Sequence, residues 1–186
     1  TAPAPAPRAH PGNRIVYCGR LTEEKGVLLV ARAARMAGMP ALFIGEGPMR
    51  AAILAENPTA EITGWLPRAE VRARLAAEAR CLVAPSLWPE TGPMVIAEAQ
   101  ALGIPAIVSA RAGGSARIRD GIDGLVIEPE SGALGAALDR LADESRAAAM
   151  GAAAWAAYQA DPPSPEAHAA RLEVLYRRML AARQAS

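Results

Sequence analysis

Two glutamates, Glu90 and Glu98, flank a stretch with the signals of a helix start. Pro93 suits the first helical turn, where its missing N–H has no partner to lose, and Gly103 with Pro105 ends the helix. Glu90 falls in the loop before this helix and Glu98 inside it. Carboxylate acceptors thus lie beside the free N–H donors of a first turn, which suits a ligand with both hydroxyls and phosphates.

Each glutamate also has a structural interpretation. Glu90 could complement the helix dipole, and Glu98 could be a solvated surface residue. The residues around Glu98 oppose the second interpretation, because they make the helix apolar nearly all round and therefore mostly buried. They are Met94, Val95, Ile96, Ala97, Ala99, Ala101 and Leu102. A buried carboxylate needs a partner.

Two cations occupy an earlier loop, residues 19–26, which begins at Gly19. They are Arg20 and Lys25, beside a helix start that Thr22 could cap. The loop matches neither the dinucleotide fingerprint nor the P-loop, which argues against a nicotinamide-dependent oxidoreductase. Lys25 is the only lysine in the chain, and a compact ammonium suits a phosphate. The alternative is a solvated pair with Glu23 or Glu24.

Three further loops offer backbone groups. Gly47 belongs to Gly-Glu-Gly-Pro at 45–48, and Trp65 with Leu66 belongs to Gly-Trp-Leu-Pro at 64–67. The paired glycines 113–114 could present amides to a phosphate or a sugar. Each has an ordinary explanation as well: glycines permit turns, and a tryptophan more often fills a core than stacks on a base.

Short apolar runs alternate with helical segments along the chain, which predicts a parallel sheet covered by helices on both faces. The expected strands are 14–18, 41–44, 61–63, 81–84, 106–109 and 125–127. The expected helices are 23–37, 48–55, 67–79, 93–102, 131–142, 144–159 and 165–182. The fold class is thus α/β, a Rossmann-like doubly wound sheet of about six strands with a helical C-terminal extension. Such sheets bind ligands at the carboxyl ends of their strands.

Length and composition limit the remaining possibilities. The 186 residues fit one domain, which we divide into a Pro/Ala linker at 1–12, a domain at 13–160 and a C-terminal helix at 161–186. An apolar stripe on that helix packs either on its own domain or on a missing one. A net charge of +1 argues against nucleic-acid or membrane-surface binding. With no membrane-length apolar run and no signal peptide, we expect a cytoplasmic protein.

The sequence provides few metal ligands. Cys18 and Cys81 fall in predicted strands about three residues out of step, so we expect two reduced thiols. His10 and His168 lie in the terminal segments, which leaves no histidine base. There is no D-x-D pair. We therefore expect no metal and no cofactor.

Taken together, these motifs resemble the C-terminal half of glycosyltransferase family 4 (group 1), retaining enzymes of the two-domain GT-B architecture. The resemblance covers about residues 13–142 and includes the E-x7-E spacing of Glu90 and Glu98. The other matching segments are Tyr-Cys-Gly-Arg-Leu at 17–21 with Lys-Gly at 25–26, Ile-Gly-Glu-Gly-Pro at 44–48, Gly-Trp-Leu at 64–66, Gly-Ile-Pro at 103–105 and Asp-Gly-Leu-Val at 123–126.

The resemblance implies a role for each site residue. Arg20 and Lys25 would hold the diphosphate of a nucleotide-sugar donor, Glu98 the ribose, and Glu90 would lie near the transferred sugar. The backbone at Gly92, Pro93, Met94 and Val95 would reach the sugar or the distal phosphate, and Trp65 with Leu66 would lie along the base. Gly19 and Gly47 complete the expected donor site.

Two positions depart from the family pattern. Gly92-Pro93 replaces its usual Phe-Gly, and Arg117 stands where the family often has a glutamate after the paired glycines. The implied function is sugar transfer from a nucleoside-diphosphate sugar, with the positive groups stabilising the departing diphosphate.

The acceptor site would belong to a missing N-terminal domain. We therefore expect this fragment to bind donor without turnover, and any weak membrane association to go through the missing domain. The alternatives are half of a sugar-nucleotide epimerase and a non-catalytic nucleotide-binding module.

Overall fold

The computed structural model describes residues 12–91 and 94–184. Its centre is a six-stranded sheet in the order β3-β2-β1-β4-β5-β6, with every named pairing parallel. The strands are β1 (Arg14–Cys18), β2 (Ala41–Ile44), β3 (Glu61–Ile62), β4 (Ala79–Ala84), β5 (Ala106–Ser109) and β6 (Gly124–Ile127). This is the doubly wound arrangement expected from the sequence.

The helices alternate with these strands. They are α1 (Val27–Ala37), α2 (Arg50–Glu56), α3 (Arg68–Glu78), α4 (Met94–Ala101), α5 (Ser131–Ala142), α6 (Glu144–Ala160) and α7 (Pro165–Gln184). Two short 3-10 helices, η1 (Glu23–Lys25) and η2 (Gly113–Arg117), follow β1 and β5. The predicted helix 23–37 is therefore two elements, because Gly26 between them is left-handed at φ 69°. None of the described helices is long and apolar enough to cross a membrane.

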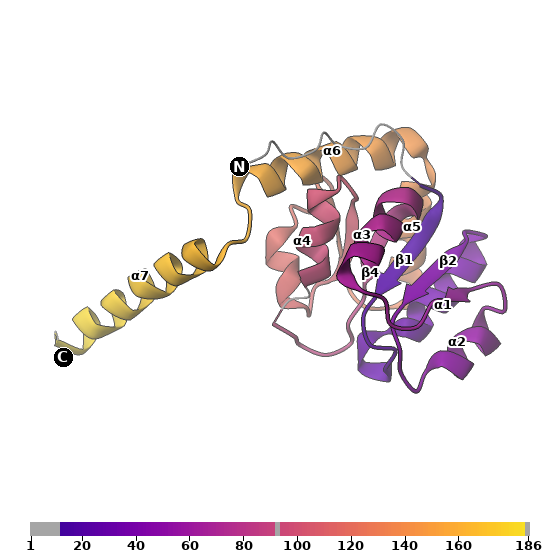
Figure 1. Cartoon of the computed structure of the whole chain (residues 1–186), viewed down its shortest axis with the longest axis horizontal. Helices are drawn as coiled ribbons and strands as arrows, with labels where there is room; N and C mark the ends of the chain where they lie inside the picture. Colours follow the sequence, from indigo (N-terminus) through magenta and orange to yellow (C-terminus); the bar gives the residue numbers. More distant parts are fainter. Residues whose placement is uncertain (1–11, 92–93, 185–186) are drawn as a thin grey trace.

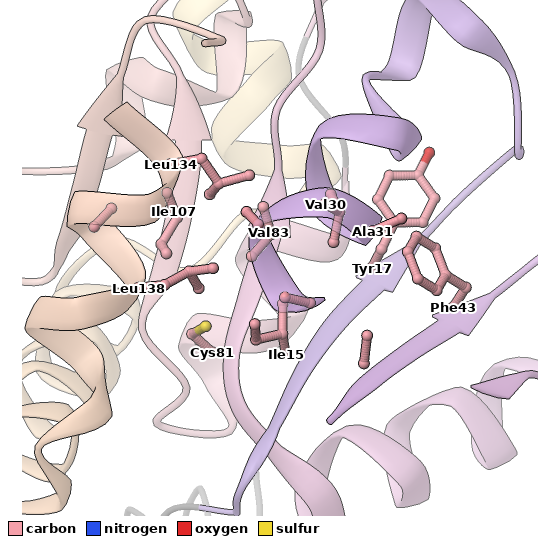
Figure 2. Packing of buried hydrophobic residues seen from close by; sticks show 14 of the residues in the cluster. Ile15, Tyr17, Val30, Ala31, Phe43, Cys81, Val83, Ile107, Leu134 and Leu138 are labelled. Atoms are coloured by element: carbon pink, nitrogen blue, oxygen red, sulfur yellow. The ribbon is translucent and has the colours of Figure 1, made fainter. Parts of the chain in front are cut away.

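Alternate residues of each strand feed two separate cores. One core lies under α1, α2 and α5 and includes Ile15, Phe43, Val83 and Leu138 (Figure 2). The other lies under α3 and α4 and includes Leu82 with Ile96. Because both faces of the sheet are covered, the central strands carry continuous apolar runs in place of an alternating pattern.

The helix α6 crosses from one layer to the other, and α7 then leaves the body of the molecule (Figure 1). α6 packs against both α4 and α5. Gly151 allows this approach, because a Cβ there would lie 2.2 Å from the carbonyl oxygen of Gly103. Asp143 caps the start of α6 by accepting a hydrogen bond from Arg146 N at 2.9 Å.

The pairing of β1 with β4 confirms the expectation for the cysteines. Ile15 lies opposite Cys81, so Cys18 is three residues further along, and both thiols are free. Arg74 contacts Glu78 on its own helix, at 2.7 Å, and also Glu61 of β3.

Candidate functional site

The strand order reverses at β1 and β4, whose following loops meet at the carboxyl edge of the sheet. The amide of Leu87, after β4, donates to the carbonyl oxygen of Glu24, after β1, at 2.9 Å. Lys25 Nζ donates to Glu90 Oε2 across the same junction. Lys25 is therefore paired with Glu90, and the alternative pairing with Glu23 or Glu24 is wrong.

Ser86 holds the other oxygen of Glu90. Its hydroxyl donates to Oε1, and the residue is only 4% exposed. Both oxygens of this carboxylate therefore have a partner within the protein, so its plane is fixed. The sequence interpretation did not include Ser86, although a serine at the exit of a buried strand, four positions before Glu90, was a usable signal.

Gly26 brings the two loops together. A Cβ at this position would lie 2.4 Å from the carbonyl oxygen of Pro85, so only glycine permits the observed approach. Its left-handed backbone also turns the chain between η1 and α1. Thr22 does not cap η1 as expected. Its hydroxyl donates to Glu24 Oε1 at 2.7 Å.

Glu98 also has a cationic partner. Its Oε1 accepts from Arg68 Nε at 2.8 Å, and its side chain is 25% exposed, so it is neither fully solvated nor fully buried. Burial, and to a lesser extent the negative charge of Glu98, raises the pKa of the Cys18 thiol to about 11.

A pocket of about 350 Å³ lies between the exits of β1 and β2. It gathers four of the predicted site residues, Gly19, Arg20, Trp65 and Leu66. Its remaining lining residues are Cys18, Ile44, Gly45, Glu46 and Val71. Trp65 is 71% exposed and lines this pocket, so the alternative interpretation of Trp65 as a core residue is wrong.

Arg20 and Gly47 are placed by contacts between the first two loops. Arg20 Nη2 lies 3.6 Å from Glu24 Oε1, with most of its side chain exposed. Gly47 packs on the loop after β1, where a Cβ would lie 2.3 Å from the carbonyl oxygen of Leu21. The amide of Leu21 donates in return to the carbonyl oxygen of Glu46 at 2.7 Å. These contacts fix the rim of the pocket.

A larger pocket, of about 810 Å³, lies along the outer side of α4. Its lining includes Thr91, Met94 and Glu98, so it adjoins the segment that carries Glu90. Met94 is 74% exposed, whereas Val95 packs against the core beneath α3 and α4. The predicted donor-binding residues Gly92 and Pro93 lie outside the described part of the chain.

Within residues 12–91 and 94–184, no group of three or more His, Cys, Asp or Glu side chains is arranged to hold a metal ion. The site is instead a set of paired charges at the switch point of a parallel sheet. Lys25 and Glu90 meet at that junction, whereas Arg20 lines the smaller pocket and Glu98 the larger one. Cations and carboxylates of this kind suit a phosphate joined to hydroxyl groups.

The comparisons with known proteins agree on one family. Residues 12–144 match the family model described as glycosyl transferases group 1. The chain is 34% identical, over 167 residues, to a GDP-mannose-dependent alpha-mannosyltransferase of Corynebacterium glutamicum. That alignment covers 80% of this chain and 40% of the relative, so the chain spans well under half of the relative's length.

Two solved structures show the same fold. The sucrose-phosphate synthase of Thermosynechococcus elongatus superposes with a TM-score of 0.74 at 27% identity, covering 94% of this chain and 46% of that one. The C-terminal domain of a glycosyl transferase group 1 family protein from Francisella tularensis has a TM-score of 0.70 at 16% identity. Here the match covers 84% of this chain and 94% of that domain.

Proposed function

The chain belongs to the glycosyl transferases of group 1, and on that basis we propose that it is the donor-binding domain of a retaining glycosyltransferase. It would bind a nucleoside-diphosphate sugar between the loops that follow β1, β2, β3 and β4. The single observation that carries this proposal is the contact of Lys25 with Glu90 at the switch point. That contact brings a phosphate-binding cation and a hydroxyl-binding acid to one place.

Each side chain has a chemical role in this proposal. Lys25 and Arg20 hold the diphosphate and stabilise the negative charge that collects on it as the glycosidic bond breaks. Glu98 accepts hydrogen bonds from the ribose hydroxyls. Glu90, fixed by Ser86, lies beside the transferred sugar. Trp65 offers its exposed face to the base above the smaller pocket.

The proposed retention of configuration at the sugar needs no nucleophile from the protein. Both oxygens of Glu90 already accept hydrogen bonds, one from Lys25 and one from Ser86. Such a carboxylate is a weak nucleophile and a good positioning group. We therefore propose attack by the acceptor on the same face from which the diphosphate leaves. The acceptor itself would be held by a further domain outside this chain, so the fragment alone would bind donor without turnover.

Isothermal titration and thermal unfolding with GDP, UDP, ADP and dTDP, each with and without a sugar, test the proposal. A ligand at about 100 times its dissociation constant should add about 2.7 kcal/mol to the free energy of unfolding. Lys25→Ala and Glu98→Ala should each remove most of that gain.

Glu56→Ala is the matched control, because Glu56 is also a partly exposed glutamate paired with surface arginines, but on α2. It should leave the ligand response unchanged. Full nucleotide response in both site variants would show that the donor is held elsewhere.

A further inference from the structure

The sequence departs from the family pattern at Arg117, and the proposed donor site does not use that arginine. It is the last residue of η2. Its Nε donates to Gln100 Oε1 and its Nη2 donates to the carbonyl oxygen of Asp161, both at 3.3 Å. Gln100, on α4, is 1% exposed and donates in return to the carbonyl oxygen of Arg117 at 3.2 Å. An ionised glutamate has no proton to give and could donate neither of the two bonds that Arg117 donates.

The other end of η2 supports the loop that carries Glu90. The amide of Gly113, the first residue of η2, donates to the carbonyl oxygen of Glu90 at 2.7 Å. Ala112, one position earlier, forms a parallel bridge with Glu90. A Cβ at Gly113 would lie 2.9 Å from the carbonyl oxygens of both Glu90 and Thr91, so the close approach depends on glycine. The main chain of Glu90 therefore rests on the start of η2.

η2 is short and hydrogen-bonded along its length. It has five residues. The amide of Ser115 donates to the carbonyl oxygen of Ala112, and the amide of Ile118 donates to that of Ser115, both at 2.9 Å. Because these bonds close successive turns of a 3-10 helix, we expect its two ends, Gly113 and Arg117, to move together.

Arg117 reaches α6 across a hollow. This hollow has a volume of about 600 Å³ and is lined by Gln100, Arg117 and Asp161 among others. On the side of α6 its lining consists of the alanines Ala156, Ala157 and Ala160. Their side chains are too short to fill the space. The guanidinium, more than packing, therefore joins η2 to the end of α6.

We propose that Arg117 is a positioning residue, which fixes the main chain of Glu90 relative to α4 and α6 through η2. Lys25 and Ser86 hold the carboxylate of Glu90. Arg117 adds a support for the backbone from the opposite end of η2. Without the guanidinium, the end of η2 is released and the hydrogen bond from Gly113 to Glu90 opens more often. This role belongs to the free protein, and only its effect on sugar binding rests on the proposed function.

Hydrogen exchange of single backbone amides, followed by NMR spectroscopy on the free chain, tests this role. The reference is the amide of Leu82, which donates to the carbonyl oxygen of Pro105 at 3.0 Å in the centre of the sheet. Relative to that amide, the amide of Gly113 should exchange about tenfold faster in Arg117→Met than in the parent, as expected for the loss of about one hydrogen bond. Equal acceleration of both amides would mean a loss of stability throughout the domain and would overturn the proposal.

Gln100→Met tests the same link from its buried side. The variant removes the amide that holds Arg117 but leaves the guanidinium in the chain, and it should also accelerate exchange at Gly113. An unchanged rate would overturn the anchoring through α4. Arg50→Met is the matched control, because Arg50 is also an arginine that donates to a main-chain carbonyl oxygen, that of Ile62, at 3.2 Å on α2. It should leave the rate at Gly113 unchanged, and a faster rate there would overturn the proposal.

Calorimetric titration with GDP and GDP-mannose, and with UDP and UDP-glucose, adds a readout at the proposed sugar position. In Arg117→Met and in Gln100→Met the affinity for the nucleotide sugar should fall about fivefold, whereas that for the nucleoside diphosphate should change by less than about twofold. A loss confined to Arg117→Met would indicate direct contact of the arginine with the ligand and would overturn the positioning role.

The two readouts distinguish this proposal from the proposed function. If the parent binds neither nucleotide but exchange at Gly113 depends on Arg117, the positioning role stands and the donor proposal fails. If the parent binds nucleotide through Lys25 and Glu98 but exchange at Gly113 does not respond to Arg117, the donor proposal stands and the positioning role fails.

Discussion

The hydroxyl of Ser86 decides how Glu90 can act. With Lys25 on one carboxylate oxygen and Ser86 on the other, the acid cannot rotate without breaking a hydrogen bond in a largely buried site. Charge-assisted hydrogen bonds of this kind are stronger than neutral ones and fix geometry as well as energy. In the proposed donor site, Ser86 would therefore act as a positioning residue for Glu90.

Ser86→Ala tests that role. Removal of the hydroxyl frees one oxygen of Glu90, so the affinity for a nucleoside-diphosphate sugar should fall about five- to tenfold. The affinity for the nucleoside diphosphate alone should change less than twofold, because the proposed position of Glu90 is beside the sugar. Calorimetric titration of both ligands measures the two effects.

Ser109→Ala is the matched control for Ser86→Ala. Ser109 is also a buried serine at the end of a strand, and its Oγ accepts from the amide of Arg111 at 3.1 Å. This variant should lose stability without altering the ratio of the two affinities. A parallel loss of nucleotide and nucleotide-sugar binding in Ser86→Ala would mean that the hydroxyl only supports the loop.

The buried thiol of Cys81 makes the domain less stable at alkaline pH. Burial raises the pKa of its thiol to about 12, above the range of an unfolded cysteine. The folded state therefore holds a proton that the unfolded chain releases. The contribution of this thiol to the free energy of unfolding is fully present below pH about 8.5. It is lost as the pH rises toward the pKa of the folded state, by up to about 1.4 kcal/mol per pH unit.

Denaturant unfolding between pH 8 and 10.5 measures this slope. Cys81→Ala should be less stable than the parent near pH 8, because it leaves a cavity, but its free energy of unfolding should decline less steeply above pH 9. Identical slopes in the parent and the variant would assign the alkaline loss to other groups.

At the scale of elements, Gly26 joins two elements that the sequence analysis predicted as one helix. The turn at this residue directs η1, with Lys25, toward the loop after β4. A side chain here would meet the carbonyl oxygen of Pro85 at 2.4 Å, so the packing of the two loops depends on glycine. The backbone turn at Gly26 therefore also determines where Lys25 lies.

Gly26→Ala should reduce the free energy of unfolding by about 2–4 kcal/mol and weaken nucleotide binding with it. About 1–2 kcal/mol comes from the left-handed backbone and the rest from the displaced loop. Gly38→Ala is the control, because Gly38 has a similar φ of 64° but no atom within 4 Å of an added Cβ. It should lose only the backbone term and bind nucleotide normally. Equal losses in both would remove the packing explanation.

The sequence predicted the elements better than their contacts. The strands at 14–18, 41–44 and 106–109 have the predicted bounds, because runs of branched apolar residues between glycines and prolines are a local signal. Partner choice is not local. Lys25 has glutamates as near neighbours in sequence yet pairs with Glu90, and Glu98 pairs with Arg68. Only the order of the strands brings these residues together.

The exposed Trp65 shows the same limit from the other direction. A tryptophan is more often buried than exposed, and burial in the core was the alternative interpretation of Trp65. β3 is only two residues long and lies at the edge of the sheet, so little protein is available to cover the loop that follows it. The exposure of this ring follows from the position of β3 at the edge of the sheet. The local sequence pattern does not reveal that position.

At the scale of the whole molecule, the compact body ends with α6, and α7 extends from it (Figure 1). Among the side chains of α7 that the structure describes, five large apolar ones are at least half exposed: Val174, Leu175, Tyr176, Met179 and Leu180. We propose that they pack on a further domain that would also hold the acceptor. The alternative from the sequence was that this stripe packs on its own domain, which would make α7 part of the stabilising core.

Removal of residues 165–186 distinguishes these alternatives. The shortened chain keeps the two cores and the residues that line both pockets. Its melting temperature should therefore stay within about 2 °C of the parent, a change below about 1 kcal/mol for a domain of this size. Its affinity for nucleotide should also be unchanged. A loss of many degrees, or of nucleotide affinity, would place α7 against this domain in solution.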